Sequence, residues 1–330
     1  MKLGNKGFAF STMLYGTLAL ILIILMLLFG VLKSSKDESY YYASIIENNL
    51  NKCVDEEVAL ENCYTSGSSN CDPTSYYACM GISGDPSGTK GIIIAEKLKE
   101  SIVTSGNGLY QDNVDVKRYV YRGSSVNNYI KYAGLTWRII AIEADGSIKA
   151  GYIGYVDKVK WDDKNADEWK SSTINNFLST EFYSSLTDTS SLTNKIWHTG
   201  RIYNVSPMTL NELKEQENNS EYSAKTGNEG YVGLPNASDY IKASLDANCT
   251  SNVLASTSCT SWLASYTSWT MNSDGDVEEG NTQKAYLFQS NSLKSVSVDT
   301  DSNILPVVFL KRTLVITEGD GTPSNPYIVS

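Results

Sequence analysis

Apolar residues follow one another without a break near the start of the chain. Residues 8–32 contain no charged side chain and are apolar on every side, whereas an amphipathic helix of a soluble protein has one polar face. About 20 such residues span the hydrocarbon core of a bilayer. A cleaved secretory signal is the alternative, but it has a shorter apolar part and a small-residue cleavage site after it. We therefore expect a retained transmembrane helix over residues 8–32.

The pattern then becomes amphipathic. Tyr42, Ile46, Leu50 and Val54 recur at helical spacing, which predicts a helical stalk over residues 33–60. Residues 61–90 are rich in Ser, Gly, Asp and Pro and hold three cysteines, so we expect a Cys-rich connector over residues 61–106 that includes a short helix over residues 92–103. Residues 1–7 precede the span as a leader, and residues 107–330 follow the connector as a head.

The head alternates between strand and helix patterns. Asp145 and Gly146 form a dipeptide typical of a type I′ turn, which predicts a hairpin. Thr209 is the expected N-cap of one helix, and Ser238 or Asp239 that of another. The fold class that we expect is therefore α+β: a long transmembrane helix and stalk, then a mixed, disulfide-bonded head with short antiparallel strands and long loops. The predicted strands cover residues 118–121, 129–132, 137–142, 148–152, 294–298, 305–311 and 314–317, and the predicted helices 173–186, 208–217 and 238–245.

All of the cysteines follow the predicted span. An even number on one side of a membrane fits an oxidising exterior with up to three disulfides. The spacings are too wide for zinc ligand pairs, and the chain has one histidine. Cys249 and Cys259, which enclose nine residues, are our preferred pair, and a bond between Cys53 and Cys63 would tie the connector to the stalk. The six disulfide candidates are Cys53, Cys63, Cys71, Cys79, Cys249 and Cys259.

The charge balance disfavours one class of partner. The chain has 27 basic and 37 acidic residues, and every acidic residue follows Lys33. Such a surface repels phosphate backbones, so we do not expect nucleic acid as a partner. The expected location is a single-pass membrane protein with a cytoplasmic N-terminus and an extracellular C-terminal domain.

Candidate chemistry is sparse. His198, the one imidazole, follows an apolar pair and is interpreted as structural, and Trp137, Trp197, Trp262 and Trp269 as core residues. Hydrolase, metalloprotease and phosphate-loop motifs are absent from the sequence, so we predict no catalytic residue, no metal, no cofactor and no enzymatic activity. Acidic residues alternate in two segments, but the EF-hand pattern is missing, which favours solvated hairpin tips over calcium. These residues are Asp274, Asp276, Glu278, Glu279, Asp299 and Asp301.

The segment KLGNKGFAFSTMLYGTLALILIILMLL resembles the signal of type IV pilins and pseudopilins. Gly7 matches the residue before the cleavage site and Phe8 the first mature residue. The resemblance implies processing by a prepilin peptidase and assembly with other pilin-like subunits. Thr12 occupies the position at which pilins usually have Glu. The resemblance therefore favours a minor subunit over the major subunit of a pilus shaft.

The distal segments, from RYVYRGSSVNNYIKYAGLTWRIIAIEADGSIKAGY to LPVVFLKRTLVITEGDGTPSNPYIVS, resemble an uncharacterised extracellular domain of low-GC Gram-positive bacteria. That domain is distantly similar to the C-type-lectin and formylglycine-generating-enzyme folds. We therefore expect a membrane-anchored, pilin-like surface protein whose head serves binding or fibre-tip assembly, with the bilayer and an extracellular ligand as partners. A non-assembling anchored adhesin or binding module is the first alternative, and a membrane-tethered enzyme with an unrecognised site is the second.

Overall fold

The computed structural model describes residues 92–218, 229–278, 280–312 and 314–329. The predicted leader, transmembrane span and stalk, and most of the connector, lie outside these residues. In the described ranges no helix combines the length and the apolar character needed to cross a bilayer.

Strand β5 (Leu135–Ile142, LTWRIIAI) organises the main sheet. Its last six residues are all buried, as expected for a strand covered on both faces. On one side it pairs antiparallel with β6 (Ile148–Tyr152). On the other it pairs with β4 (Tyr129–Tyr132) over its first half and with β3 (Tyr119–Arg122) over its second.

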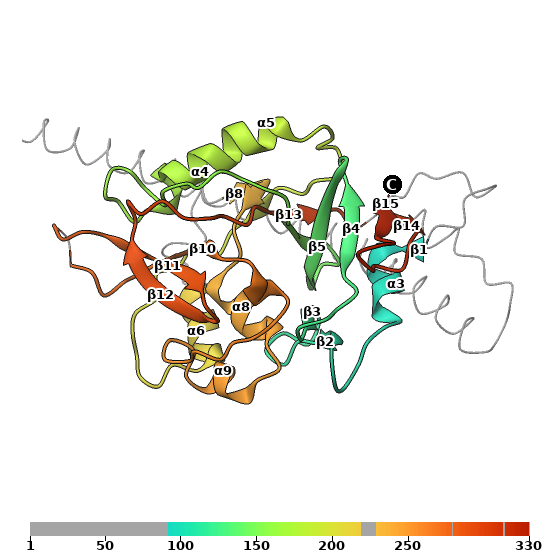
Figure 1. Ribbon diagram of the computed structural model, residues 1–330, viewed down its shortest axis with the longest axis horizontal. Helices are drawn as coiled ribbons and strands as arrows, with labels where there is room; N and C mark the ends of the chain where they lie inside the picture. Colours follow the sequence, from blue (N-terminus) through green and yellow to red (C-terminus); the bar gives the residue numbers. More distant parts are fainter. Residues whose placement is uncertain (1–91, 219–228, 279, 313, 330) are drawn as a thin grey trace, which may run out of the picture. The chain divides into compact units, whose positions relative to one another are not determined.

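The main sheet has ten strands, in the order β1-β14-β15-β4-β5-β6-β13-β9, with β3 and its partner β2 beside the second half of β5. The first and last described strands therefore lie close together, because β1 pairs with β14 and β14 with β15 (Figure 1). The further strands are β1 (Ile92–Ile93), β2 (Gly108–Gln111), β9 (Val232–Gly233), β13 (Val307–Leu310), β14 (Val315–Glu318) and β15 (Tyr327–Val329).

Two smaller sheets complete the strands of the described ranges. One is the antiparallel meander β10 (Ser268–Ser273), β11 (Lys284–Gln289) and β12 (Ser292–Ser297). The other pairs β7 (Lys195–Ile196) with β8 (Glu229–Gly230).

Helical segments cover the sheet on two sides (Figure 1). A nearly continuous helix, α4 (Thr173–Phe177), the π-turn η2 (Leu178–Phe182) and α5 (Tyr183–Ser185), packs Phe182 against Trp137 and Tyr152. Three helices lie on the other side in Figure 1: α6 (Leu210–Glu217), α8 (Ala237–Ala243) and α9 (Ala247–Ser251). The remaining segments are α3 (Ile94–Lys99) and the 3-10 turns η1 (Trp169–Ser171) and η3 (Leu263–Ser265).

Tryptophans dominate the core. The four that the sequence assigns to the core are indeed buried, and Trp161 is buried with them. Each of these five indole N–H groups donates to a backbone carbonyl oxygen, so that no polar cost offsets the large apolar area that each ring buries. These side chains fix the spacing between the sheet and its covering helices.

The expected fold class is wrong about the head. The structure is still a mixture of helices and strands, but most of its strands join one large sheet, and this sheet is mixed, since β4 and β15 run parallel. The reason lies in the tail. The last predicted strand covers residues 314–317, but the segment containing Gly319 and Gly321 then turns the chain so that Tyr327–Val329 continues the sheet beside β4.

The β5–β6 hairpin is confirmed, but its predicted type I′ turn is wrong. Only Gly146 has a positive φ, of 82°, and the Gly146 N–H donates to the Glu143 carbonyl, which gives a longer loop with glycine in the left-handed region. Two-residue turns with both φ angles positive occur elsewhere, at Ala133–Gly134 before β5 and at Ser290–Asn291 before β12.

Of the two predicted helix N-caps, one is confirmed and the other is wrong. Thr209 caps α6, and its hydroxyl and Glu212 form a reciprocal capping box. For α8 the cap is Asn236 rather than Ser238 or Asp239, because the Asp239 carboxylate accepts the Asn236 backbone N–H and so lies inside the helix.

Candidate functional site

A cleft of about 720 Å³ lies between the main sheet and helices α6 and α8. Its walls come from the β2–β3 loop, the β5–β6 hairpin, β6, β7, β13, α6 and α8. We call it the basic cleft, because its lining holds more basic than acidic side chains although the whole chain is acidic. The basic side chains are Arg118, Lys149, Lys195, Lys214 and Lys242, and the acidic ones are Asp115, Glu143 and Asp145.

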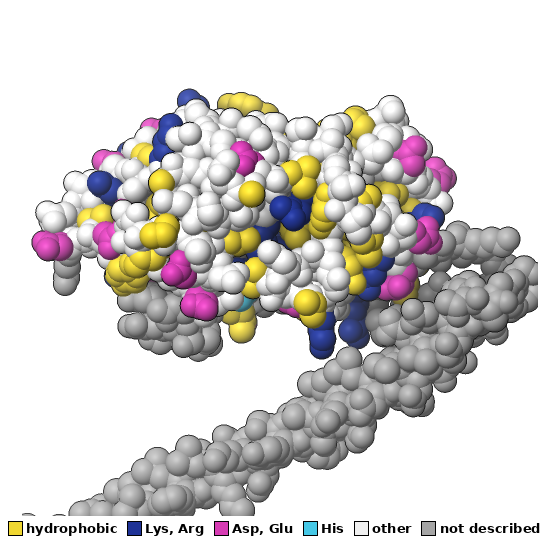
Figure 2. All heavy atoms as spheres, turned by 90° about the horizontal axis from the view of Figure 1, so that it is seen from below, with side chains coloured by type: hydrophobic (Ala, Val, Ile, Leu, Met, Phe, Trp, Pro, Cys, Tyr) yellow, Lys and Arg dark blue, Asp and Glu magenta, His cyan; other side chains and the backbone are white. Residues whose placement is uncertain are grey.

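Figure 2 shows one face of the molecule, on which some Lys and Arg side chains lie in a hollow beside apolar ones while others project at the outline. The apolar part of the cleft rim is formed by Val114 and Ile196, which are 39% and 50% exposed. The cleft thus offers a ligand both charged donors and apolar contact.

Arg118 is the hub of the buried charges behind the cleft. Its guanidinium donates to Asp112 Oδ2 at 3.1 Å, Glu143 Oε2 at 2.9 Å and Asp239 Oδ1 at 3.1 Å. The pKa of Arg118 is raised, because the three carboxylates outweigh the effect of burial. Burial alone would raise the pKa of the Glu143 carboxyl, but Arg118 and Lys149 hold it below its usual range.

Lys149 extends this network towards α8. Its Nζ donates to Asp239 Oδ2 at 2.5 Å and to Asn236 Oδ1 at 3.3 Å, and all three residues are buried. Burial opposes the charge on Asp239, but Lys149 and Arg118 keep the pKa of that carboxyl far below its usual range. The ammonium also lies 5.9 Å from the ring centre of Trp197 and 5.6 Å from that of Phe309. A cation, an amide and a carboxylate are thus held together in a nearly dry site.

Lys242 provides the third buried cation. Its Nζ donates to Asp112 Oδ2 at 2.5 Å. Burial and the nearby Arg118 lower the pKa of this ammonium, and Asp112 acts in the opposite direction. Three cations, Arg118, Lys149 and Lys242, therefore stand against three carboxylates, Asp112, Glu143 and Asp239. Buried ion pairs of this kind contribute little net stability, but losing one partner costs much, so the network favours one arrangement of the cleft walls.

Two lysines stand nearer the solvent. The side chain of Lys195 is 24% exposed and pairs with Asp145, and that of Lys214 is 21% exposed and lies 3.6 Å from Glu217. Each ammonium carries three donors, so it can serve a carboxylate of the protein and an oxygen atom of a ligand at once. His198 lines the cleft as an exposed side chain. Its pKa is lowered, because neighbouring protein atoms and the positive charges of Lys214 and Lys149 disfavour the imidazolium.

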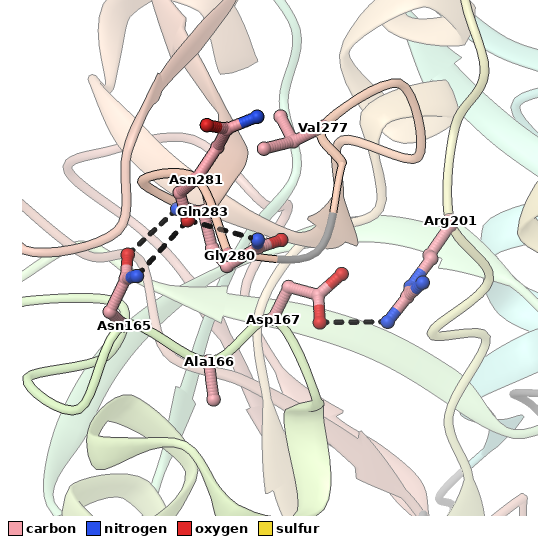
Figure 3. Close-up of a pocket in the computed structure, with 8 residues that line it drawn as sticks. All are labelled: Asn165, Ala166, Asp167, Arg201, Val277, Gly280, Asn281 and Gln283. Atoms are coloured by element: carbon pink, nitrogen blue, oxygen red, sulfur yellow. Dashed lines mark hydrogen bonds and ion pairs between the residues drawn. The ribbon is translucent and has the colours of Figure 1, made fainter.

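A second hollow, of about 260 Å³, lies between residues 165–167, Arg201 and residues 277–283 (Figure 3). Its polar groups bond to one another. Arg201 donates to Asp167 at 2.7 Å, and Asn165 donates to the Asn281 carbonyl and accepts from the Gln283 N–H. Because this hollow is smaller and its lining holds a single basic side chain, we give more weight to the basic cleft.

The predicted disulfide is confirmed. Cys249 on α9 and Cys259 in the loop before η3 are bonded and fully buried. They lie outside the cleft lining. The other sites predicted from sequence fall outside the described residues: Gly7, Phe8, Cys53, Cys63, Cys71 and Cys79.

The acidic segments are engaged by the protein itself. Asp274 accepts from the Asp276 N–H and the Ser295 hydroxyl, and Asp276 accepts from the Asn204 N–H. Asp299 accepts from the Ser297 hydroxyl. Within the described ranges no group of three or more His, Cys, Asp or Glu side chains is placed to hold a metal ion.

The residues of the buried network were missed from sequence. Asp112, Arg118, Glu143, Lys149 and Asp239 are up to 127 positions apart, and no motif connects them. One local signal existed: Lys149 interrupts an apolar stretch, IKAGY, that follows a buried hairpin strand. A charged residue at such a position needs a partner, and its partner had to come from elsewhere in the chain.

The chain was also compared with known proteins. No protein-family model, no curated protein and no solved structure matches it. The resemblances to pilin signals and to the Gram-positive extracellular domain therefore stay predictions.

Proposed function

We propose that the head is an extracellular binding module whose basic cleft takes a small ligand bearing an oxyanion, such as a carboxylate, phosphate or sulfate. The observation that carries the proposal is the concentration of basic side chains in a cleft of about 720 Å³, on a chain of net charge −10. Such a volume is within the usual range for small-ligand pockets, about 300–1,000 Å³.

The charge distribution limits the size of the ligand. The acidic surface outside the cleft repels an extended polyanion, whereas the cleft itself attracts a small one. Lys195 and Lys214 are the donors that we assign to the oxyanion, because they are more exposed than the three buried cations. Val114 and Ile196 provide contact for an apolar part of the ligand.

An extracellular location is supported by the buried Cys249–Cys259 disulfide, since such bonds persist in oxidising compartments. The pilin-like reading rests on Gly7 and Phe8 and on no feature of the head. The N-terminal residue of the mature protein, identified by mass spectrometry, would decide between a processed pilin-like subunit, which begins at Phe8, and a binding module that is not processed there.

The cleft is tested by calorimetric titration of the full chain with citrate, inorganic phosphate and glucuronate, with glucose as the neutral match of glucuronate. We expect saturable binding of at least one anion and none of glucose. Lys214→Gln and Lys195→Gln should each weaken it about tenfold, the equivalent of roughly 1.4 kcal/mol.

Lys294→Gln is the matched control, because Lys294 is an exposed lysine on β12, away from the cleft. It should leave the affinity unchanged. If none of the three anions binds, or if the cleft variants bind as tightly as the control, the cleft does not recognise oxyanions.

A further inference from the structure

Lys149, Asn236 and Asp239 form an arrangement that a simple ion pair does not require. The Lys149 Nζ lies 3.3 Å from Asn236 Oδ1, the oxygen bonded to the side-chain carbonyl carbon, and 2.5 Å from Asp239 Oδ2. The same Asp239 oxygen accepts the Asn236 backbone N–H at 2.9 Å. The Lys149 amine therefore lies within hydrogen-bond distance of both an amide carbonyl oxygen and a carboxylate oxygen.

The Asn236 side chain is fixed in this orientation. Its Nδ2 donates to the His198 carbonyl at 2.6 Å and lies 3.4 Å from Asn272 Oδ1, so the carbonyl side of the amide faces Lys149. Lys149, Asn236 and Asp239 are 4%, 1% and 2% exposed. Groups that a fold holds beside one another in one orientation gain much of the advantage of an intramolecular reaction.

We propose that Lys149 and Asn236 become joined by an intramolecular amide bond between their side chains, with Asp239 transferring the protons. Nζ of Lys149 attacks Cγ of Asn236. The bond between Cγ and Nδ2 breaks, and Nδ2 leaves as ammonia. The product is a covalent link between strand β6 and the N-cap of helix α8.

The protons balance without any further reagent. The Lys149 ammonium gives one proton to Asp239 and becomes a neutral nucleophile. After the attack a second proton passes from Nζ, through Asp239, to the departing Nδ2. The new amide keeps one hydrogen, ammonia carries three, and Asp239 holds the fifth. Transfer by a positioned carboxyl group in this way is ordinary general acid–base catalysis.

The surrounding charges are compatible with the product. Before the reaction three buried cations face two buried carboxylates, Asp112 and Asp239, and a partly exposed one, Glu143. The reaction removes the charge of Lys149, and the proton retained by Asp239 removes one negative charge, so Arg118 and Lys242 then face Asp112 and Glu143. A neutral amide also costs less to bury than an ammonium–carboxylate pair. The lining of the cleft includes both Lys149 and Asn236, which gives ammonia an exit.

Lys242 provides an internal comparison. It is equally buried and donates to Asp112 Oδ2 at 2.5 Å, but the second side chain at that carboxylate is Arg118, whose guanidinium offers no amide carbonyl carbon for the amine to attack. We therefore assign the bond to Lys149 alone.

The test is tryptic digestion of the reduced, alkylated full chain followed by mass spectrometry. Trypsin does not cleave after an acylated lysine. We expect one branched species in which residues 139–158 are joined to residues 226–242, with the summed mass reduced by one ammonia. Separate peptides ending at Lys149 and at Lys242 would overturn the proposal.

Substitutions separate a chemical role from a structural one. Lys149→Arg keeps a cation for Asp239 but should abolish the branched species while tryptophan fluorescence stays native. Asn236→Asp should change the loss from ammonia to water, and Asp239→Asn should leave most of the chain unlinked. Lys242→Arg is the matched control and should leave the branched species intact. A branched species in the Lys149→Arg variant would show that another residue forms the bond.

Discussion

The hub of the buried network can be tested by replacing Arg118 with methionine. In the native chain its guanidinium, 6% exposed, makes three charged hydrogen bonds of 2.9–3.1 Å. After Arg118→Met, Asp112 still has Lys242 and Asp239 still has Lys149, whereas Glu143 loses its ion-pair partner. The main penalty is therefore a carboxylate, 23% exposed, that keeps only the charge of Lys149 nearby, for which we expect a loss of about 1–3 kcal/mol in the free energy of unfolding at pH 7.

Urea unfolding followed by tryptophan fluorescence measures this loss. All six tryptophans lie between residues 137 and 269, so the signal reports on the head alone. Arg312→Met is the control, since Arg312 is exposed. A cost for Arg118→Met within about 0.5 kcal/mol of the control, the usual size of a surface substitution, would refute the assigned role of Arg118.

The effect should also depend on pH. The folded-state pKa of Glu143, Asp112 and Asp239 is lowered, so their pairs stabilise the native protein above the unfolded-state pKa of about 4 and lose this effect as pH falls through the folded values. In Arg118→Met the pKa of Glu143 returns upwards. The difference between native and variant should therefore shrink from pH 7 towards pH 4, and a difference that grows on acidification would contradict the reasoning.

Two further predictions concern the loops. Replacing both Cys249 and Cys259 by serine should lower the free energy of unfolding by about 2–4 kcal/mol, measured by urea unfolding in non-reducing buffer, and an unchanged midpoint would count against the bond. Gly321→Ala should cost about 1–3 kcal/mol more than Gly280→Ala in thermal melts. Both glycines have positive φ, but a Cβ at Gly321 would lie 2.4 Å from the Tyr327 ring, whereas one at Gly280 meets nothing within 4 Å, so equal costs would contradict the packing argument.

Local patterns predicted individual elements of the head well. The β-branched and aromatic runs around β4, β5 and β6 form strands, as predicted, because each run contains several residues that favour β structure. The threonine cap of α6 was correct for the same reason, since a capping box lies within four residues. The patterns did not predict which strands pair with one another. The parallel contact of β15 with β4 joins Tyr327 to Ile130, and nothing in either segment specifies the other.

Turn types were predicted less well from residue preferences. The dipeptide Asp145-Gly146 suggested a type I′ turn, yet the chain uses that geometry at Ala133–Gly134 and Ser290–Asn291. The strand register decides which loop length is needed, and β5 continues to Ile142 before the chain turns. Ala133 accepts φ of 51° because two-residue hairpins match the twist of their strands.

The buried network was beyond the reach of sequence for a physical reason. From sequence alone a lysine or an aspartate is expected at the surface. Only the fold shows that β6 places Lys149 next to Asp239 of α8. Asp239 and Lys242 are three residues apart on α8 yet take different partners, Arg118 with Lys149 in one case and Asp112 in the other. Because burying unpaired charges is so costly, these groups fix the distance between α8 and the sheet. The same constraint holds the Asn236 amide beside Lys149. The requirement for paired charges thus provides the geometry that a side-chain amide bond would need.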